Sequence, residues 1–193
     1  LTALDVSSDG EYVYAGTDDG NVWVGKSDGT EWNKVSESLP NRWVTRVTVD
    51  PDSSNIFYVT YSGYRYNSYL AHVYRKDDYG NTWTDISGNL HETPVNDILV
   101  DPIETFRLYV ATDVGVFTTG DLGTSWSHIS NTLPNVPVTD ISLHNPTRTI
   151  VAATYGRSMY KIDISQLVSV ESSEEIISDY RLKKNYPNPF NPF

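Results

Sequence analysis

The stretch Lys76-Asp77-Asp78-Tyr79-Gly80-Asn81-Thr82-Trp83 returns 43 residues later as Thr119-Gly120-Asp121-Leu122-Gly123-Thr124-Ser125-Trp126. A shorter copy, Ser27-Asp28-Gly29-Thr30-Glu31-Trp32, lies near the start of the chain. In each copy an acidic, glycine-containing segment leads directly into a tryptophan. Aspartate accepts hydrogen bonds from nearby backbone N–H groups, and glycine adopts backbone conformations that other residues resist. Each copy therefore predicts a tight hairpin whose tryptophan ring packs between neighbouring elements. We expect this turn to serve the fold and to carry no chemistry of its own.

The tryptophans of these turns define an internal repeat. Trp32, Trp83 and Trp126 are 51 and 43 residues apart, and an apolar segment starts 12 residues after each of them. A period of this length, made of four short strands, is the signature of a β-propeller blade. The predicted fold class is all-β: a β-propeller portion with about four blades of four antiparallel strands, the last blade incomplete, followed by an extended linker.

The repeat divides the chain into blades at about residues 1–43, 44–94, 95–137 and 138–164. In the third blade, alternation and turns predict strands over 95–100, 107–112, 115–119 and 126–129. The second blade carries an insertion of eight residues, within 62–72. The fourth blade shows three strands, over 138–143, 149–154 and 158–162, with no tryptophan turn after them. Because open sheet edges promote aggregation, we expect missing upstream blades to close the ring, or else a partner chain.

The end of the chain has a different composition. Residues 165–184 read as an acidic linker, in which 166–170 could form one edge strand. Residues 185–193 contain three prolines, which exclude a helix or a central strand and predict an extended segment.

Composition excludes several classes of partner and site. The chain has 193 residues, a net charge of −11 and a pI of about 4.6, which argues against nucleic acid and against anionic membranes. No apolar run is long enough for membrane insertion. Without cysteine there is no disulfide and no thiolate metal site, and the four histidines share no metal-ligand spacing. We therefore expect no cofactor and no metal. The alternative is calcium on Asp77, Asp78 and Asp121, although a calcium cage needs six or more oxygens and the turn offers few.

The turns Asp78-x-Gly80-x-Thr82-Trp83 and Asp121-x-Gly123-x-Ser125-Trp126 resemble the Asp-box of the BNR-repeat families, which include sialidases, sortilin-like ectodomains and xyloglucan-cleaving glycoside hydrolases. Segments 111–117 and 153–160 resemble strand turns of the sortilin/xyloglucanase-like group. The resemblance covers residues 1–162 and implies a propeller. The structural Asp-box residues that it implies are Asp28, Gly29, Trp32, Asp78, Gly80, Thr82, Trp83, Asp121, Gly123, Ser125 and Trp126. The first copy departs from the pattern, because Asp28 and Gly29 are adjacent and Glu31 replaces threonine.

The tail Tyr186-Pro187-Asn188-Pro189-Phe190-Asn191-Pro192 resembles the start of the C-terminal sorting domain used in type IX secretion. This resemblance implies a protein that is secreted or held on the outer cell surface of a Gram-negative bacterium. The alternative is a plain proline-rich linker, which implies no location.

No residue is assigned a catalytic role. Sialidases use an arginine triad, but no arginine of this chain stands in the Arg-Ile-Pro context that opens their pattern. Glycosidases generally use a carboxylate pair. The acidic candidates are Asp18, Asp19, Asp97, Asp113 and Asp140. Of these, Asp97 and Asp140 share one repeat position, which Arg46 takes in the second blade, and a repeated position is more often structural than catalytic.

A ligand is expected at the end of the propeller opposite the Asp-box turns, where the loops between second and third strands and the blade-crossing loops meet. The candidate ligand residues are Arg42, Trp43, Tyr64, Arg65, Tyr66, Tyr69, Asp113, Tyr155 and Arg157, with Asp18, Asp19, His91 and Glu92 beside them. Tyrosine, tryptophan and arginine together form surfaces that stack sugars or anchor proteins. The alternative is that the aromatics pack the insertion onto its own blade.

Two functions follow from these observations. The first is a secreted or cell-surface Asp-box propeller that binds a glycan or an extracellular protein, or serves as a scaffold. The second is the C-terminal part of a glycoside hydrolase, xyloglucanase-like or sialidase-like, with catalytic carboxylates partly outside this chain.

Overall fold

The computed structural model describes residues 1–63, 72–77, 82–130 and 133–167, which form four antiparallel sheets. The first sheet contains β1 (Ala3–Val6), β2 (Tyr12–Gly16), β3 (Val22–Lys26) and β4 (Asn33–Lys34). The second contains β5 (Val44–Asp50), β6 (Ser53–Tyr61), β7 (Val73–Lys76) and β8 (Thr84–Asp85). The third contains β9 (Val95–Val100), β10 (Leu108–Thr112), β11 (Gly115–Thr119) and β12 (Ser127–His128). The fourth contains β13 (Val138–His144), β14 (Thr149–Thr154) and β15 (Met159–Asp163), with a short 3₁₀ helix, η1 (Asn145–Thr147), between its first two strands.

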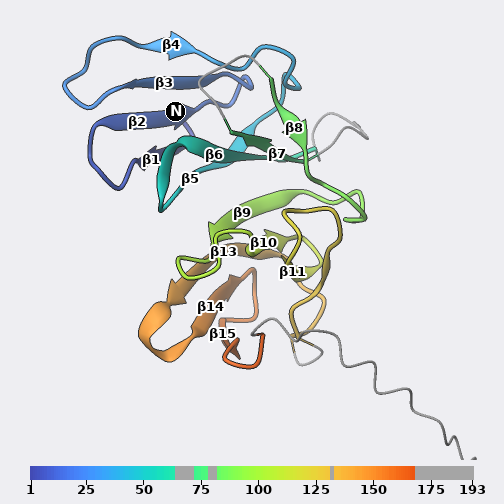
Figure 1. The fold of residues 1–193 in the computed structure, drawn as a ribbon. Coiled ribbons are helices and arrows are strands. Elements are labelled where there is room, and N and C mark those ends of the chain that lie inside the picture. The colour runs from blue at the N-terminus through green and yellow to red at the C-terminus, as the bar shows by residue number, and fades with distance from the viewer. Residues whose placement is uncertain (64–71, 78–81, 131–132, 168–193) are drawn as a thin grey trace, which may run out of the picture.

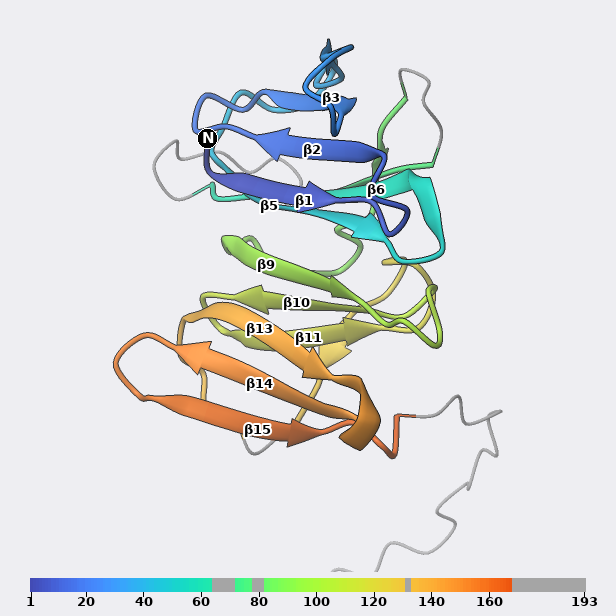
Figure 2. The same ribbon diagram turned by 90° about the vertical axis from the view of Figure 1, so that its left-hand side faces the viewer.

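Within each sheet the strands pair in the order of the sequence, so every sheet is a meander. The sheets stack face to face, and their first strands, β1, β5, β9 and β13, lie next to one another (Figures 1 and 2). This is the arrangement of consecutive propeller blades, here called blades 1 to 4. The predicted all-β class and the incomplete last blade are confirmed, and the described sheets do not close into a ring.

Most predicted strands agree with the structure to within a residue, and the differences have local causes. The strand expected over 126–129 shortens to β12 because the backbone N–H of Trp126 bonds the side chain of Asn89, at 2.6 Å, instead of joining the ladder. The strand expected to begin at Ser158 begins at Met159, because Ser158 has a left-handed backbone (φ 66°) and belongs to the preceding turn. The eight-residue insertion lies largely outside the described residues, as does the edge strand expected over 166–170.

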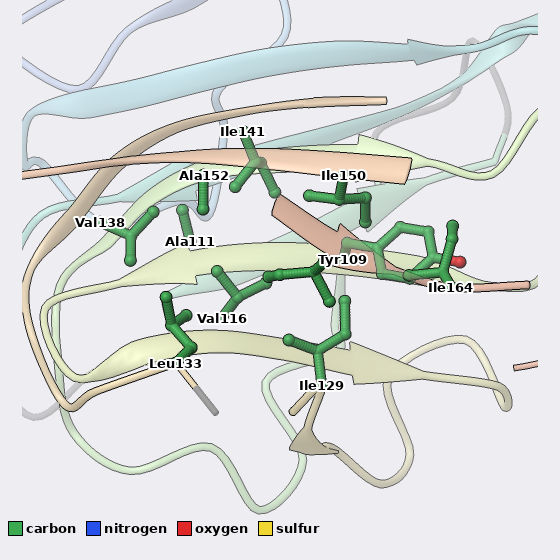
Figure 3. Close-up of a cluster of buried hydrophobic side chains, with 11 residues drawn as sticks. Tyr109, Ala111, Val116, Ile129, Leu133, Val138, Ile141, Ile150, Ala152 and Ile164 are labelled. Carbon is green, nitrogen blue, oxygen red and sulfur yellow. The ribbon is translucent and has the colours of Figure 1, made fainter. Parts of the chain in front are cut away.

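The core consists of three apolar clusters, one between each pair of successive blades. Blades 1 to 3 each place a tyrosine of the second strand at the same point of this interface: Tyr14, Tyr58 and Tyr109, all at most 1% exposed. Figure 3 shows the cluster between blades 3 and 4, in which the Tyr109 ring lies close to Ile150 and Ile164. A blade therefore completes its core only against its neighbour, as repeat architectures require.

Hydrogen bonds between first strands repeat in step with the blades. Thr2 Oγ1 donates to the carbonyl of Val44 at 2.7 Å, and Thr45 Oγ1 donates to that of Val95 at 2.5 Å. In blade 3 the same position is Asn96, whose amide donates to the carbonyl of Val138 at 2.8 Å. A polar side chain at this repeat position, which lies just before β1 in blade 1 and second in β5 and β9, thus bonds the next blade in blades 1 to 3. No helix within the described ranges has the length and apolar character of a membrane span.

Candidate functional site

The two ends of the blades carry different turns, and the loops expected to bind a ligand lie together at one of them. There, in blades 2 to 4, the turn after the second strand bonds the segment that enters the blade: Ser62 N–H to the carbonyl of Trp43 at 3.1 Å, Asp113 N–H to that of Pro94 at 3.3 Å, and Tyr155 N–H to that of Pro137 at 2.8 Å. We call this end the loop face. At the opposite end the Asp/Gly/Trp turns lie beside the first hairpins, since Leu122 N–H bonds the carbonyl of Phe106.

Several predicted ligand residues lie on the loop face. Tyr155 is 78% exposed, and Arg157 is exposed two residues further along the same turn. Trp43 is half-buried, and so is Asp113, whose Oδ1 accepts a hydrogen bond from the Asn96 amide at 2.9 Å. The four predicted residues of the insertion, Tyr64, Arg65, Tyr66 and Tyr69, lie outside the described residues.

Arg42 is placed differently from its neighbours on this face. Its side chain is 2% exposed, and its guanidinium carbon lies 5.5 Å from the centre of the Tyr61 ring. Burial lowers the pKa of Arg42 and raises that of Tyr61. Arg42 therefore packs within the blade and does not present its guanidinium to a ligand, although its sequence position suggested an exposed loop residue.

A polar recess opens on the loop face of blade 1. It has a volume of about 370 Å³ and lies between the β2–β3 turn and the segment that crosses to blade 2. Its lining is Asp19, Gly20, Asn21, Lys34, Ser36, Leu39 and Asn41. Asp18 is exposed on the same turn. The sequence pattern pointed to Asp18 and Asp19 but not to the other lining residues, because the recess forms from two segments that only the fold brings together.

Three charged side chains meet across the first strands of blades 2 to 4. Arg46 Nη2 lies 2.9 Å from Asp97 Oδ2 and 2.9 Å from Asp140 Oδ1, and Arg46 Nε also donates to Asp97. Asp97 is fully buried and accepts the N–H groups of Ile98 and Ile141 at 2.8 and 2.9 Å. Burial raises the pKa of Asp97, and the Arg46 side chain opposes that rise. The bonds of Asp97 therefore join blade 3 to blades 2 and 4, whereas the Asp140 side chain is 59% exposed.

The Asp/Gly/Trp turn of blade 3 is closed by its aspartate. Asp121 accepts from Thr119 Oγ1 at 2.6 Å, from Ser125 N–H at 2.9 Å and from Ser125 Oγ at 2.6 Å. These bonds, that from Ser125 first, hold the pKa of Asp121 below its ordinary value. Gly123 has the left-handed backbone (φ 85°) that favours glycine. Trp126 is 5% exposed and packs toward blade 2.

The other two turns vary this arrangement. In blade 2, Asp78 and Gly80 lie outside the described residues, Thr82 is exposed and Trp83 is half-buried. In blade 1, Asp28 accepts from the N–H and hydroxyl of Thr30 at 2.9 and 2.6 Å, which closes a shorter turn with Gly29 left-handed.

Blade 1 has an open apolar face on the side away from blade 2. Leu4 is 53% exposed, Val6 47% and Trp32 43%. The residues that match Leu4 in the repeat, Val47 and Ile98, are at most 1% exposed because each packs against the preceding blade.

In the described part of the chain, no three His, Asp or Glu side chains gather in a way that could hold a metal ion.

No protein-family model matches the chain, and no curated protein matches it. Solved structures do share its fold. A GH74 enzyme of Niastella koreensis is 18% identical, with a TM-score of 0.66, over 84% of this chain and 28% of its own. The GH74 xyloglucanase from Xanthomonas campestris is 16% identical, with a TM-score of 0.60, over 84% of this chain and 29% of its own. The β-propeller domain of Cps50 (Swd1) from Myceliophteria thermophila is 14% identical, with a TM-score of 0.67, over 91% of this chain and 56% of its own.

These similarities support a β-propeller fold and no particular activity, because one fold hosts many functions. The chain spans less than a third of the length of the two GH74 proteins.

Proposed function

We propose that this chain is a glycan-binding portion of a β-propeller that meets its ligand on the loop face. The observation that carries the proposal is the composition of that face: an aromatic ring at Tyr155, a cation at Arg157 and a polar recess in blade 1. The fold shared with GH74 propellers, one of them a xyloglucanase, supports a polysaccharide as the ligand.

The turn that carries Tyr155 is built to present this ring. Its backbone N–H bonds Pro137, and Thr154 Oγ1 donates to the carbonyl of Ser158 at 2.7 Å, which closes the turn. Gly156 supplies the left-handed residue (φ 80°). A large ring held outward on a fixed turn loses little conformational entropy when a sugar stacks on it.

A glycoside hydrolase is the second candidate, favoured by the GH74 neighbours. Glycosidases need two carboxyl groups about 5–9.5 Å apart across the scissile bond. Arg46 bonds both aspartates of the repeated first-strand position, but Asp97 is buried and the Asp140 side chain is 59% exposed. The chain would therefore supply Asp140, and the second carboxylate would come from elsewhere.

The proposal includes a partner and a location. Another blade, upstream or on a partner chain, would cover Leu4, Val6 and Trp32 and extend the ring. The Asp/Gly/Trp turns would be Asp-boxes, which serve the fold. The tail, as the start of a type IX sorting domain, would direct the protein out of the cell or onto its surface, where polysaccharide is met.

The test is affinity electrophoresis of the chain in gels that contain xyloglucan, other plant polysaccharides or none. Retardation is expected with at least one polysaccharide, and Tyr155→Ala should reduce it several-fold. Phe106→Ala is the matched control, since Phe106 is 41% exposed at the opposite end. Equal retardation of both variants, or no retardation in any gel, contradicts binding at the loop face. Reducing sugar released by the protein, and lost in Asp140→Asn, would favour the hydrolase.

A further inference from the structure

The recess of blade 1 has the size and the fixed walls of a small-molecule site. Its volume of about 370 Å³ lies within the range of ligand pockets, about 300–1,000 Å³. Gly20, at φ 86°, lets the β2–β3 turn approach the crossing segment closely, because a Cβ there would lie 2.7 Å from the backbone nitrogen of Arg42. The two walls therefore approach each other closely.

One wall of the recess carries a hydrogen-bond acceptor, the Asp19 carboxylate, which neighbouring side chains hold in position. The Thr17 hydroxyl donates to Asp19 Oδ1, and the Asn21 amide donates to Asp19 Oδ2 at 2.7 Å. The Thr17 bond, with that of Asn21, lowers the pKa of Asp19, so its carboxylate is ionised at neutral pH. Lys34 makes no ion pair with any described residue and supplies a cation at the same recess.

The decisive observation is the hydroxyl of Ser36. Ser36 lines the recess and is 8% exposed, yet its Oγ has no hydrogen-bond partner among the described residues. Its counterpart in blade 2, Ser87, accepts the N–H groups of His72 and Val73, both at 3.0 Å. In blade 1 the N–H equivalent to that of His72 belongs to Asn21, and it donates to the Thr17 hydroxyl at 3.0 Å. The serine hydroxyl that accepts backbone N–H groups in blade 2 therefore accepts none from the described residues in blade 1.

A buried hydroxyl without a partner costs roughly 1–3 kcal/mol, so a ligand group that bonds the Ser36 hydroxyl would recover that cost. We propose that the recess binds one neutral, hydroxyl-rich sugar unit. Ser36 and Asn41 supply groups that both donate and accept, Asp19 accepts and Lys34 donates, which together match adjacent sugar hydroxyls. The inference rests on the proposed function, of which it defines one subsite.

The experiment is an NMR titration of the ¹⁵N-labelled chain with xylose, glucose and galactose, and with glucuronic acid as the acidic arm. Amide shifts are expected at Gly20, Asn21 and Asn41 with at least one neutral sugar. Ser36→Ala should weaken that binding about five- to tenfold, as the loss of one hydrogen bond would. It should leave the melting temperature unchanged or raise it. Shifts only with the acidic sugar, or no shift at the recess with any sugar, would overturn the proposal.

Ser87→Ala is the matched control. It removes the same hydroxyl from blade 2, where the hydroxyl accepts two backbone N–H groups, so it should lower the melting temperature and leave the affinity for the sugar unchanged.

Equal affinity of Ser36→Ala and the unsubstituted chain would also overturn the subsite. If polysaccharide still retards the chain in that case, the proposed function stands without it. If a sugar titrates the recess but no polysaccharide retards the chain, the subsite stands and the proposed function falls.

Discussion

The indole N–H of Trp126 donates to the backbone carbonyl of Ile86 at 2.9 Å, which ties blade 3 to the outer edge of blade 2. Trp83 makes the same bond from blade 2 to the carbonyl of Val35 in blade 1, at 2.7 Å. The tryptophan that ends each Asp/Gly/Trp turn therefore acts backward along the chain, on the blade before its own. In blade 1 the matching ring, Trp32, is 43% exposed on the open face.

Replacing these tryptophans should give unequal losses of stability. Trp126→Ala should lower the free energy of unfolding by about 3–5 kcal/mol, because a buried ring and its hydrogen bond are lost. Trp32→Ala should cost less than about 1 kcal/mol, since its ring is half exposed. Urea unfolding followed by circular dichroism would measure both. Similar costs for the two variants would contradict the backward packing.

The Arg46–Asp97 pair should stabilise the join between blades 2 and 3. Asp97→Ala should cost about 3 kcal/mol, the low end for breaking a buried pair, because Arg46 is 36% exposed and water screens it in part. Asp140→Ala, which removes the exposed partner of the same arginine, should cost under about 1 kcal/mol. The two values come from matched denaturant curves, and an equal loss would show that Asp97 does not join the blades.

The turn of blade 3 should make stability depend on pH in the acid range. The pKa of Asp121 is lower in the folded chain than in the unfolded chain, so its contribution is present above the unfolded pKa, about 4, and is lost as the pH falls through the folded pKa. Asp121→Asn should therefore be less stable at pH 6 and should show a shallower decline below about pH 4. Melting temperatures from pH 2 to 7 would show this, and parallel curves for the two proteins would count against it.

The open face of blade 1 should tolerate charge where its counterparts do not. Leu4→Asp should change the free energy of unfolding by no more than about 0.5 kcal/mol, whereas Ile98→Asp, at the same repeat position but fully buried, should prevent folding. Leu4→Asp should also reduce self-association at high concentration, because exposed apolar patches promote it. Light scattering after size exclusion measures the association. If Leu4→Asp lowered the free energy of unfolding by more than about 0.5 kcal/mol, the face would already be covered.

Much of the fold followed from local pattern. The strand alternation predicted most of the strands, since the hydrogen bonds within a sheet join neighbouring strands whose period is visible in the sequence. The candidate site was predicted less completely. Tyr155 and Arg157 lie exposed on the loop face, but Arg42 is buried. No pattern in the sequence points to Ser36, because it is an isolated serine in a crossing segment.

The sequence by itself determined the repeat, because its spacing is visible along the chain. It also determined the all-β class and the closing of the Asp/Gly/Trp turns, because strand alternation and turn bonds involve residues close together in the chain. Tertiary structure alone decided what each tryptophan holds: the acceptor of Trp126 is Ile86, 40 residues away, and it exists only once the sheets stack. It also decided that the Trp32 ring is 43% exposed, on the face of blade 1 away from blade 2. Pairing between blades depends on how whole sheets face one another, and no local period encodes that.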